Sequence, residues 1–102
     1  MGRFSHRTLG VPSSLRIKLR SSDTAAWTIT TATVDIKADD GTVLREAQAA
    51  TIDNAQKRVS YRDDWDVDDD YVVGWYWAIF RVTMDDGDMV VFEGSFEMRA
   101  GR

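Results

Sequence analysis

Few side chains in this sequence are able to carry out catalysis or hold a metal. His6 is the only histidine, and there is no cysteine. One imidazole without any thiolate cannot build the His- or Cys-rich sites that hold zinc. A Ser–His–acid triad would require His6 to fold onto the rest of the chain beside a serine, and the sequence has no nucleophile motif or phosphate-binding glycine loop. We therefore expect a protein that is not an enzyme and that uses no cofactor, and we predict no metal site built from histidine or cysteine.

An aspartate-rich stretch from Arg62 to Asp70 is the main polar cluster. Closely spaced carboxylates suit calcium, but the stretch lacks the glycine and the terminal glutamate of a hand-type calcium loop. A solvated loop, a docking surface for a basic partner and a calcium-dependent adhesion site all stay open. The residues of this stretch that we expect to face a partner are Asp66, Asp68, Asp69 and Asp70.

The segment 74–84 is the most informative one, because its side chains alternate as in a β-strand. One face holds Tyr76, Ala78, Phe80, Val82 and Met84, and the other holds Trp75, Trp77, Ile79, Arg81 and Thr83. The first set stays apolar to its end and predicts the core face. Trp75, Trp77 and Ile79 then point outward and predict a protein interface, because tryptophan is enriched among interface anchors. Cover by a loop or by the N-terminal segment is one alternative, and a sugar-binding platform of Trp75 and Trp77 is another.

The rest of the chain predicts the elements that would hold this strand in place. The segments that we expect to be strands are 15–20, 28–38, 42–46, 47–52, 58–61, 72–84 and 89–99, with a loop at 21–23 and a bulge or bend at Gly94. Asp40-Gly41 and Asp86-Gly87 predict tight hairpin turns. About seven short strands joined by turns predict an all-β, immunoglobulin-like antiparallel β-sandwich. Its predicted core includes Val34, Ile36, Val59, Tyr76, Phe80 and Val82.

The size and the charge of the chain limit what it can bind. Its 102 residues suffice for one domain, which we place at 14–102 behind an extended arm at 1–13. Residues 1–20 hold five of the 13 basic residues and no acid, so the remainder has eight basic residues against 17 acidic ones, a net charge of −9. This acidic body argues against nucleic-acid binding. The arm has no hydrophobic period, so we expect it to become ordered only on a neighbour, with Arg3 and Arg7 paired to acidic residues there.

No apolar stretch reaches the length of a signal peptide or a membrane helix, so we expect no membrane contact. The absence of cysteine favours assembly in a reducing cytosol.

Several motifs together resemble a known family. They are Ala32–Lys37, the turn segment Ala38–Val43, Arg58–Tyr61 with Trp65 downstream, and the aromatic strand with its Asp-Gly turn at 74–87. Residues 30–99 thereby resemble the immunoglobulin-like domain that opens many phage upper-baseplate proteins (the BppU N-terminal type), also found in small tail and neck proteins. The sequence differs from that family in a shorter N-terminal strand pair and in its outward Trp75, Trp77 and Ile79.

The resemblance implies a structural virion protein of a tailed phage, in the neck, tail or baseplate, assembled in the host cytoplasm. Its implied partners are other virion proteins and copies of itself, as a homo-oligomer in the particle. A capsid decoration protein and a carbohydrate-binding module that uses Trp75 and Trp77 are the alternatives.

Overall fold

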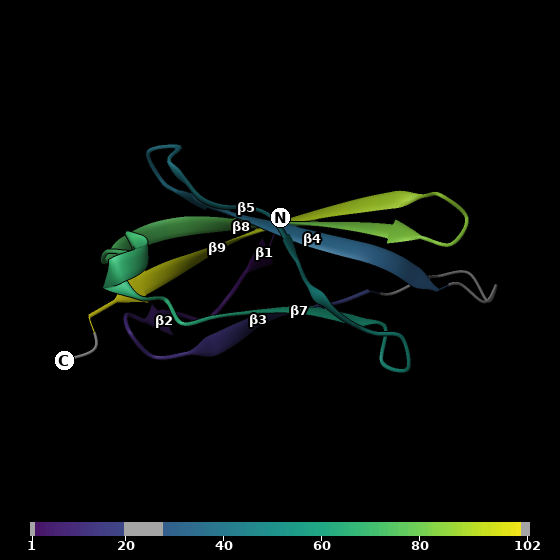
Figure 1. Cartoon of the computed structure of the whole chain (residues 1–102), viewed down its shortest axis with the longest axis horizontal. Helices are drawn as coiled ribbons and strands as arrows, with labels where there is room; N and C mark the ends of the chain where they lie inside the picture. Colours follow the sequence, from purple (N-terminus) through teal and green to yellow (C-terminus); the bar gives the residue numbers. More distant parts are fainter. Residues whose placement is uncertain (1, 20–27, 101–102) are drawn as a thin grey trace.

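Two β-sheets face each other across an apolar core in the computed structural model of the chain, which describes residues 2–19 and 28–100 (Figure 1). The six-stranded sheet contains β1 (Gly2–Arg3), β2 (Arg7–Thr8), β4 (Ile29–Ala38), β5 (Val43–Ala49), β8 (Gly74–Met84) and β9 (Met89–Arg99). The three-stranded sheet contains β3 (Ser13–Lys18), β6 (Thr51–Asp53) and β7 (Arg58–Asp63). A short 3-10 turn, η1 (Val67–Asp69), lies between β7 and β8.

The strand order identifies an immunoglobulin-like sandwich and confirms the predicted fold class. The larger sheet runs β1-β9-β8-β4-β5, with β2 also on β9, and the smaller runs β3-β7-β6. Each of the seven predicted strands has a counterpart among β3 to β9. The predicted loop at 21–23 lies outside the described residues. No helix in the described part of the chain is long and apolar enough to cross a membrane.

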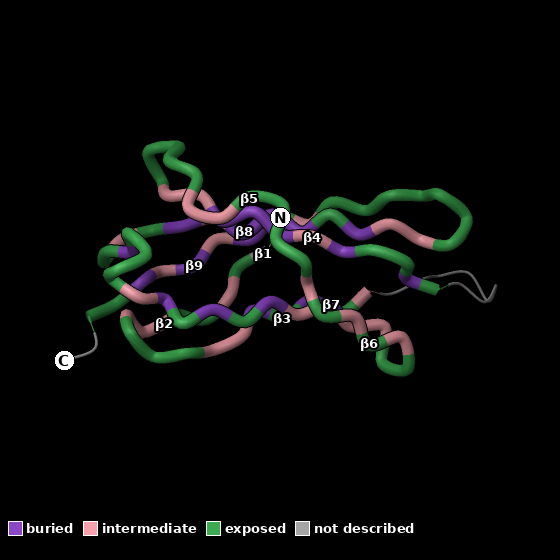
Figure 2. The backbone as a smooth tube through the Cα atoms, in the orientation of Figure 1, coloured by how far each residue is buried: buried purple, intermediate pink, exposed green. Residues whose placement is uncertain are grey.

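Period-2 alternation places the core between the sheets, and buried residues lie along strands of both sheets (Figure 2). The six predicted core residues, Val34, Ile36, Val59, Tyr76, Phe80 and Val82, are all buried, which confirms the register assigned to 74–84. Both predicted hairpin turns are present as well. Gly41 and Gly87 supply their positive φ angles of 95° and 90°.

The first eight residues correct one expectation. The prediction that the arm becomes ordered only on a neighbour is wrong for residues 2–8, since β1 and β2 pair in parallel with β9. Pairing with an open sheet edge needs no hydrophobic period, only free backbone groups on the neighbouring strand. Phe4 adds an apolar contact, because its ring lies 6.2 Å from that of Phe80 and 5.9 Å from that of Phe92.

Gly94 has a different role from the one predicted. The β8–β9 register runs without a shift from Gly74↔Met98 to Thr83↔Met89, so β9 has no bulge there. A Cβ on Gly94 would lie 2.5 Å from Cε2 of Phe4. The glycine therefore makes room for the Phe4 ring against the inner face of the sheet.

A tyrosine corner fixes the entry into β8. The hydroxyl of Tyr76 donates to the carbonyl of Val72 at 2.7 Å and accepts from its N–H at 2.9 Å. Such a tyrosine, bonded to backbone a few residues upstream, is typical of immunoglobulin-like sandwiches. The contact holds 72–74 in place and so positions the residues around Trp75.

Candidate functional site

Trp75, Trp77 and Ile79 share the outer face of β8, as their alternation predicts, but they are not equally accessible. Trp75 is 41% exposed and Ile79 only 8%, with Trp77 in between. β8 lies between β4 and β9, so its outer side chains are flanked on both sides. Ile79 pairs in register with Asp35 and Glu93. Cross-strand neighbours therefore cover this part of the face, and the predicted three-residue apolar patch is reduced to Trp75 with part of Trp77.

Arg3 and Arg7 make contacts within the chain. The guanidinium of Arg3 lies over the Trp75 ring, 4.9 Å from its centroid, in a cation–π contact. Arg7 donates to the carbonyl of Ser14 at 2.8 Å, to Oγ of Ser13 at 3.2 Å and to Oγ of Ser5 at 2.7 Å. Burial lowers the pKa of Arg7, and the charge of Arg16 adds to this. Arg7 therefore ties the β9 edge of one sheet to the start of β3 in the other.

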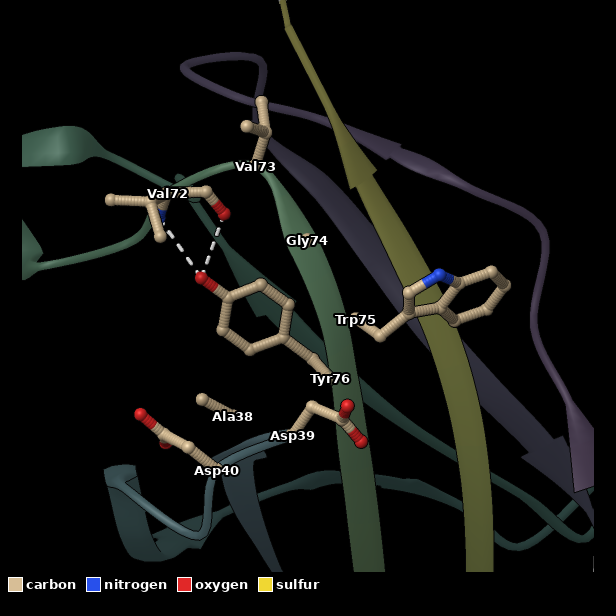
Figure 3. A pocket seen from close by; sticks show the side chains of 8 residues that line it. All are labelled: Ala38, Asp39, Asp40, Val72, Val73, Gly74, Trp75 and Tyr76. Atoms are coloured by element: carbon tan, nitrogen blue, oxygen red, sulfur yellow. Dashed lines mark hydrogen bonds between the residues drawn. The ribbon is translucent and has the colours of Figure 1, made fainter.

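An open pocket of about 330 Å³ lies beside Trp75 (Figure 3). Its lining residues come from the end of β4 with the turn after it and from the entry into β8, and they are Ala38, Asp39, Asp40, Val72, Val73, Gly74, Trp75 and Tyr76. A backbone hydrogen bond from Asp39 to the carbonyl of Trp75, at 3.0 Å, joins the two segments. Val72 and Val73 stand on one side and the two aspartates on the other.

The chemistry of this pocket suits a group with an apolar body and a hydrogen-bond-donating or cationic end. Val72 and Val73 are 58% and 55% exposed, so they offer apolar surface that the chain itself leaves open. The carboxylate of Asp40 accepts from the N–H of Thr42 at 2.9 Å. That bond lowers the pKa of Asp40, which therefore keeps its negative charge at neutral pH.

The aspartates of 66–70 surround η1. The carboxylate of Asp66 caps the turn by accepting from the N–H of Asp68 at 3.1 Å, and Asp70 ends it at a φ of 71°. Asp69 forms an ion pair with Arg45 at 3.2 Å. Apart from the half-buried Asp66, these residues are exposed. Within residues 2–19 and 28–100, no group of three or more His, Cys, Asp or Glu side chains is placed to hold a metal ion.

Asp63 belongs to the acidic stretch in the sequence, but its side chain is buried between the sheets. Its Oδ2 accepts from the hydroxyl of Tyr61 at 2.6 Å, from that of Tyr71 at 2.9 Å and from Nε of Arg45 at 3.1 Å. Its Oδ1 accepts from the N–H of Trp65 at 3.1 Å. Burial alone would raise the pKa of Asp63, but these hydrogen bonds and the Arg45 charge outweigh it, and the pKa lies below its usual value.

The Asp63 cluster joins the two layers. Arg45 comes from β5 of one sheet, Tyr61 and Asp63 come from β7 of the other, and Tyr71 comes from the segment before β8. Burial, followed by the nearby Asp63 charge, raises the pKa of both tyrosines, so their hydroxyls stay protonated and donate. The alternation of Val59, Tyr61 and Asp63 is the sequence signal that could have identified this carboxylate as an inward residue. The cluster fixes Asp63 and Tyr71 on either side of η1. It thereby positions η1 and also Val72 and Val73, which line the pocket.

Together these features define an immunoglobulin-like β-sandwich with an exposed, partly apolar pocket at one end. The comparisons with known proteins agree on the fold. No protein family and no curated protein matches the sequence. Among solved structures the chain is similar to CopC from Methylosinus trichosporium OB3b, with a TM-score of 0.68 over 100% of this chain and 88% of that one. At 14% identity the likeness shows the fold alone.

Proposed function

We propose that this chain is a non-catalytic protein-binding module that serves as a structural subunit of a tailed-phage particle, in the neck, tail or baseplate. In this proposal Trp75 and the pocket beside it contact a neighbouring virion protein. The observation that carries the binding role is Trp75, 41% exposed next to Val72 and Val73 in a pocket with two carboxylates. The phage role rests on the resemblance of the 74–87 strand and turn to the immunoglobulin-like domains of baseplate proteins.

The physical reason for an interface is the apolar area that the sandwich leaves open here. Tryptophan and arginine are the residue types that most often dominate the binding energy of protein interfaces. Trp75 and Arg3 lie in contact at this site, with the indole held by the register of β8 and the guanidinium by β1. Because strand backbones fix both residues, a partner need not order a loop on binding, and little conformational entropy is lost.

A carbohydrate-binding module is a second candidate, because an exposed indole beside Asp39 and Asp40 also suits a sugar ring whose hydroxyls donate to carboxylates. A platform for two successive rings would use Trp77 as well. Trp77 is only half-exposed, and Arg3 covers part of Trp75. These contacts favour a protein partner over a glycan chain.

The test is co-expression of the chain with the products of its neighbouring genes, followed by purification of the tagged wild type, Trp75→Ser and Met89→Ser. Met89 is 61% exposed on the far end of the same sheet and serves as the matched control. We expect a structural virion protein to co-purify with the wild type and with Met89→Ser and to be lost with Trp75→Ser. Equal recovery of the partner with the wild type and both variants would refute the interface. Retention of glycans by the isolated wild type, abolished in Trp75→Ser, would establish the carbohydrate role instead.

A further inference from the structure

The outer face of the three-stranded sheet is strongly basic. On β3 the inward residues are Leu15 and Ile17, and on β7 they are Val59 and Tyr61. The intervening residues point outward, and those that carry positive charge are Arg16, Lys18, Arg58 and Arg62. We call these four residues the cationic face. The antiparallel register, with Ser14 opposite Arg62 and Lys18 opposite Arg58, places all four on two adjacent strands.

These charges are not neutralised by the part of the chain that the structure describes. Arg45, Arg81 and Arg99 each form an ion pair with an acid, whereas no residue of the cationic face pairs with another described residue. The one acid in register with the face is Asp53, opposite Arg58. Since strands rise about 3.4 Å per residue, Arg58 and Arg62 stand about 14 Å apart along β7. Four like charges in so short a strip repel one another, so a bound anionic group would be favoured.

The acidic loop, residues 64–70, has the complementary charge. Asp64, Asp68 and Asp70 are exposed, and Val67 between them is 60% exposed. The loop lies at one end of the sandwich and is held towards the six-stranded sheet by the Arg45–Asp69 ion pair (Figure 1). It makes no ion pair with the cationic face of the same chain within the described residues. The two oppositely charged surfaces are thus both available to a second molecule.

We propose that the cationic face binds the acidic loop of a second copy of this chain. This inference rests on the proposed function as a structural subunit of a particle and on the homo-oligomer that the family resemblance implies. The contact joins two different surfaces, so it is heterologous. An open assembly then has a free cationic face at one end and a free acidic loop at the other, and it can close into a ring or continue as a filament. A nucleic acid fits less well, because the face offers no aromatic side chain for stacking and the net charge of −4 repels phosphates.

A charge-swap experiment tests this. The variant Arg16→Glu/Arg62→Glu lowers the charge of the face from +4 to zero. The variant Asp64→Lys/Asp68→Lys changes the charge of the loop from −5 to −1 without touching the cap at Asp66 or the ion pair of Asp69. Sedimentation measured at about 0.05 M salt should show self-association of the wild type, which weakens at about 0.5 M salt because charge pairs are screened. Each variant alone should self-associate roughly 100-fold more weakly, because most of the charge attraction between face and loop is removed. An equimolar mixture should recover association as one-to-one dimers, because the intact face of the loop variant can meet the intact loop of the face variant.

The matched control is Asp85→Lys/Asp88→Lys, which makes the same charge change in the turn at the other end of the sandwich and should self-associate like the wild type. All variants should keep the wild-type melting temperature, since the changed side chains are exposed. A monomeric wild type at low salt would overturn the inference, as would a mixture that stays monomeric. Retention of a duplex DNA probe by the wild type and not by Arg16→Glu/Arg62→Glu would overturn it in favour of nucleic acid. Trp75→Ser should self-associate normally, so a failure here is distinguishable from a failure of the Trp75 interface.

Discussion

Replacing Asp63 by asparagine tests the polar cluster between the sheets. Asparagine keeps the shape of the side chain but removes its charge and turns one acceptor oxygen into a donor NH₂ group. In the wild type the two tyrosine hydroxyls and Nε of Arg45 all donate to the single atom Oδ2. The asparagine amide cannot accept from all of the wild-type donors in either orientation. Its NH₂ group must face either the two tyrosine hydroxyls and Arg45 or the N–H of Trp65.

The cost of this change follows from the geometry. A buried donor that loses its acceptor costs about 1–3 kcal/mol, and one or two donors are affected here. The Arg45 side chain is 23% exposed and keeps Asp69, so its own loss is reduced by solvent and by the second carboxylate. We therefore expect Asp63→Asn to lower the free energy of unfolding by about 2–4 kcal/mol at pH 7. This is a large fraction of the roughly 5–15 kcal/mol typical of a domain.

The loss of unfolding free energy caused by Asp63→Asn should depend on pH. The pKa of Asp63 is lower in the folded chain than in the unfolded one, so its stabilisation is complete above the unfolded value of about 3.9. It disappears as the pH falls through the folded pKa. Urea unfolding followed by tryptophan fluorescence at several pH values should show a constant difference from pH 7 to about 5 that shrinks below about 4. Asp64→Asn, an exposed neighbour, is the control. A loss under about 1 kcal/mol, or one that does not shrink in acid, would refute the reasoning.

Three further changes test the packing. Phe80→Ala removes a fully buried ring and should cost about 3–5 kcal/mol in urea unfolding, whereas a loss under about 1 kcal/mol would contradict its inward position. Gly94→Ala should displace the Phe4 ring, so combining it with Phe4→Ala should cost less than the sum of the two single losses; full additivity would mean that the contact is unimportant. Tyr76→Phe removes both hydrogen bonds to Val72 and should cost about 1–2 kcal/mol, checked by thermal unfolding, and an unchanged melting temperature would exclude a role for the corner.

Local alternation was enough to predict most of the fold. In β3 the order Leu15, Arg16, Ile17, Lys18 gives both the strand and its buried face. In β8 one face becomes polar at Arg81 and the other stays apolar to Met84, and this difference identifies the core side. The strand that the sequence predicts to end at Glu46 continues to Ala49, three residues further, because the alanines of 47–50 carry little pattern. The structure changes sheets at Ala50, where β5 ends its pairing with β4 and β6 begins to pair with β7.

The ordering of the N-terminal residues was not predictable by the same means. Two-residue strands such as β1 and β2 are too short for any periodicity, and their stability depends on an open edge of β9 that the sequence does not show. The signal was present in two distant residues, Phe4 and Gly94. A glycine inside an otherwise good strand often marks a close approach of another group. Only the three-dimensional arrangement identifies that group as the Phe4 ring.

The charge distribution shows most clearly why the candidate surfaces needed the structure. Counted along the chain, the basic residues gather in the first 20 positions, and this suggested a basic arm that reaches for an acidic neighbour. In the fold, Arg3 and Arg7 are used within the chain, and the unpaired charge lies elsewhere. Arg16 and Lys18 join Arg58 and Arg62 only because β3 pairs with β7, some 40 residues away along the chain. Because strand pairing brings these residues together, counting charges along the sequence does not reveal the surface that they form. The net charge of −4 is therefore compatible with a basic sheet face between acidic ends.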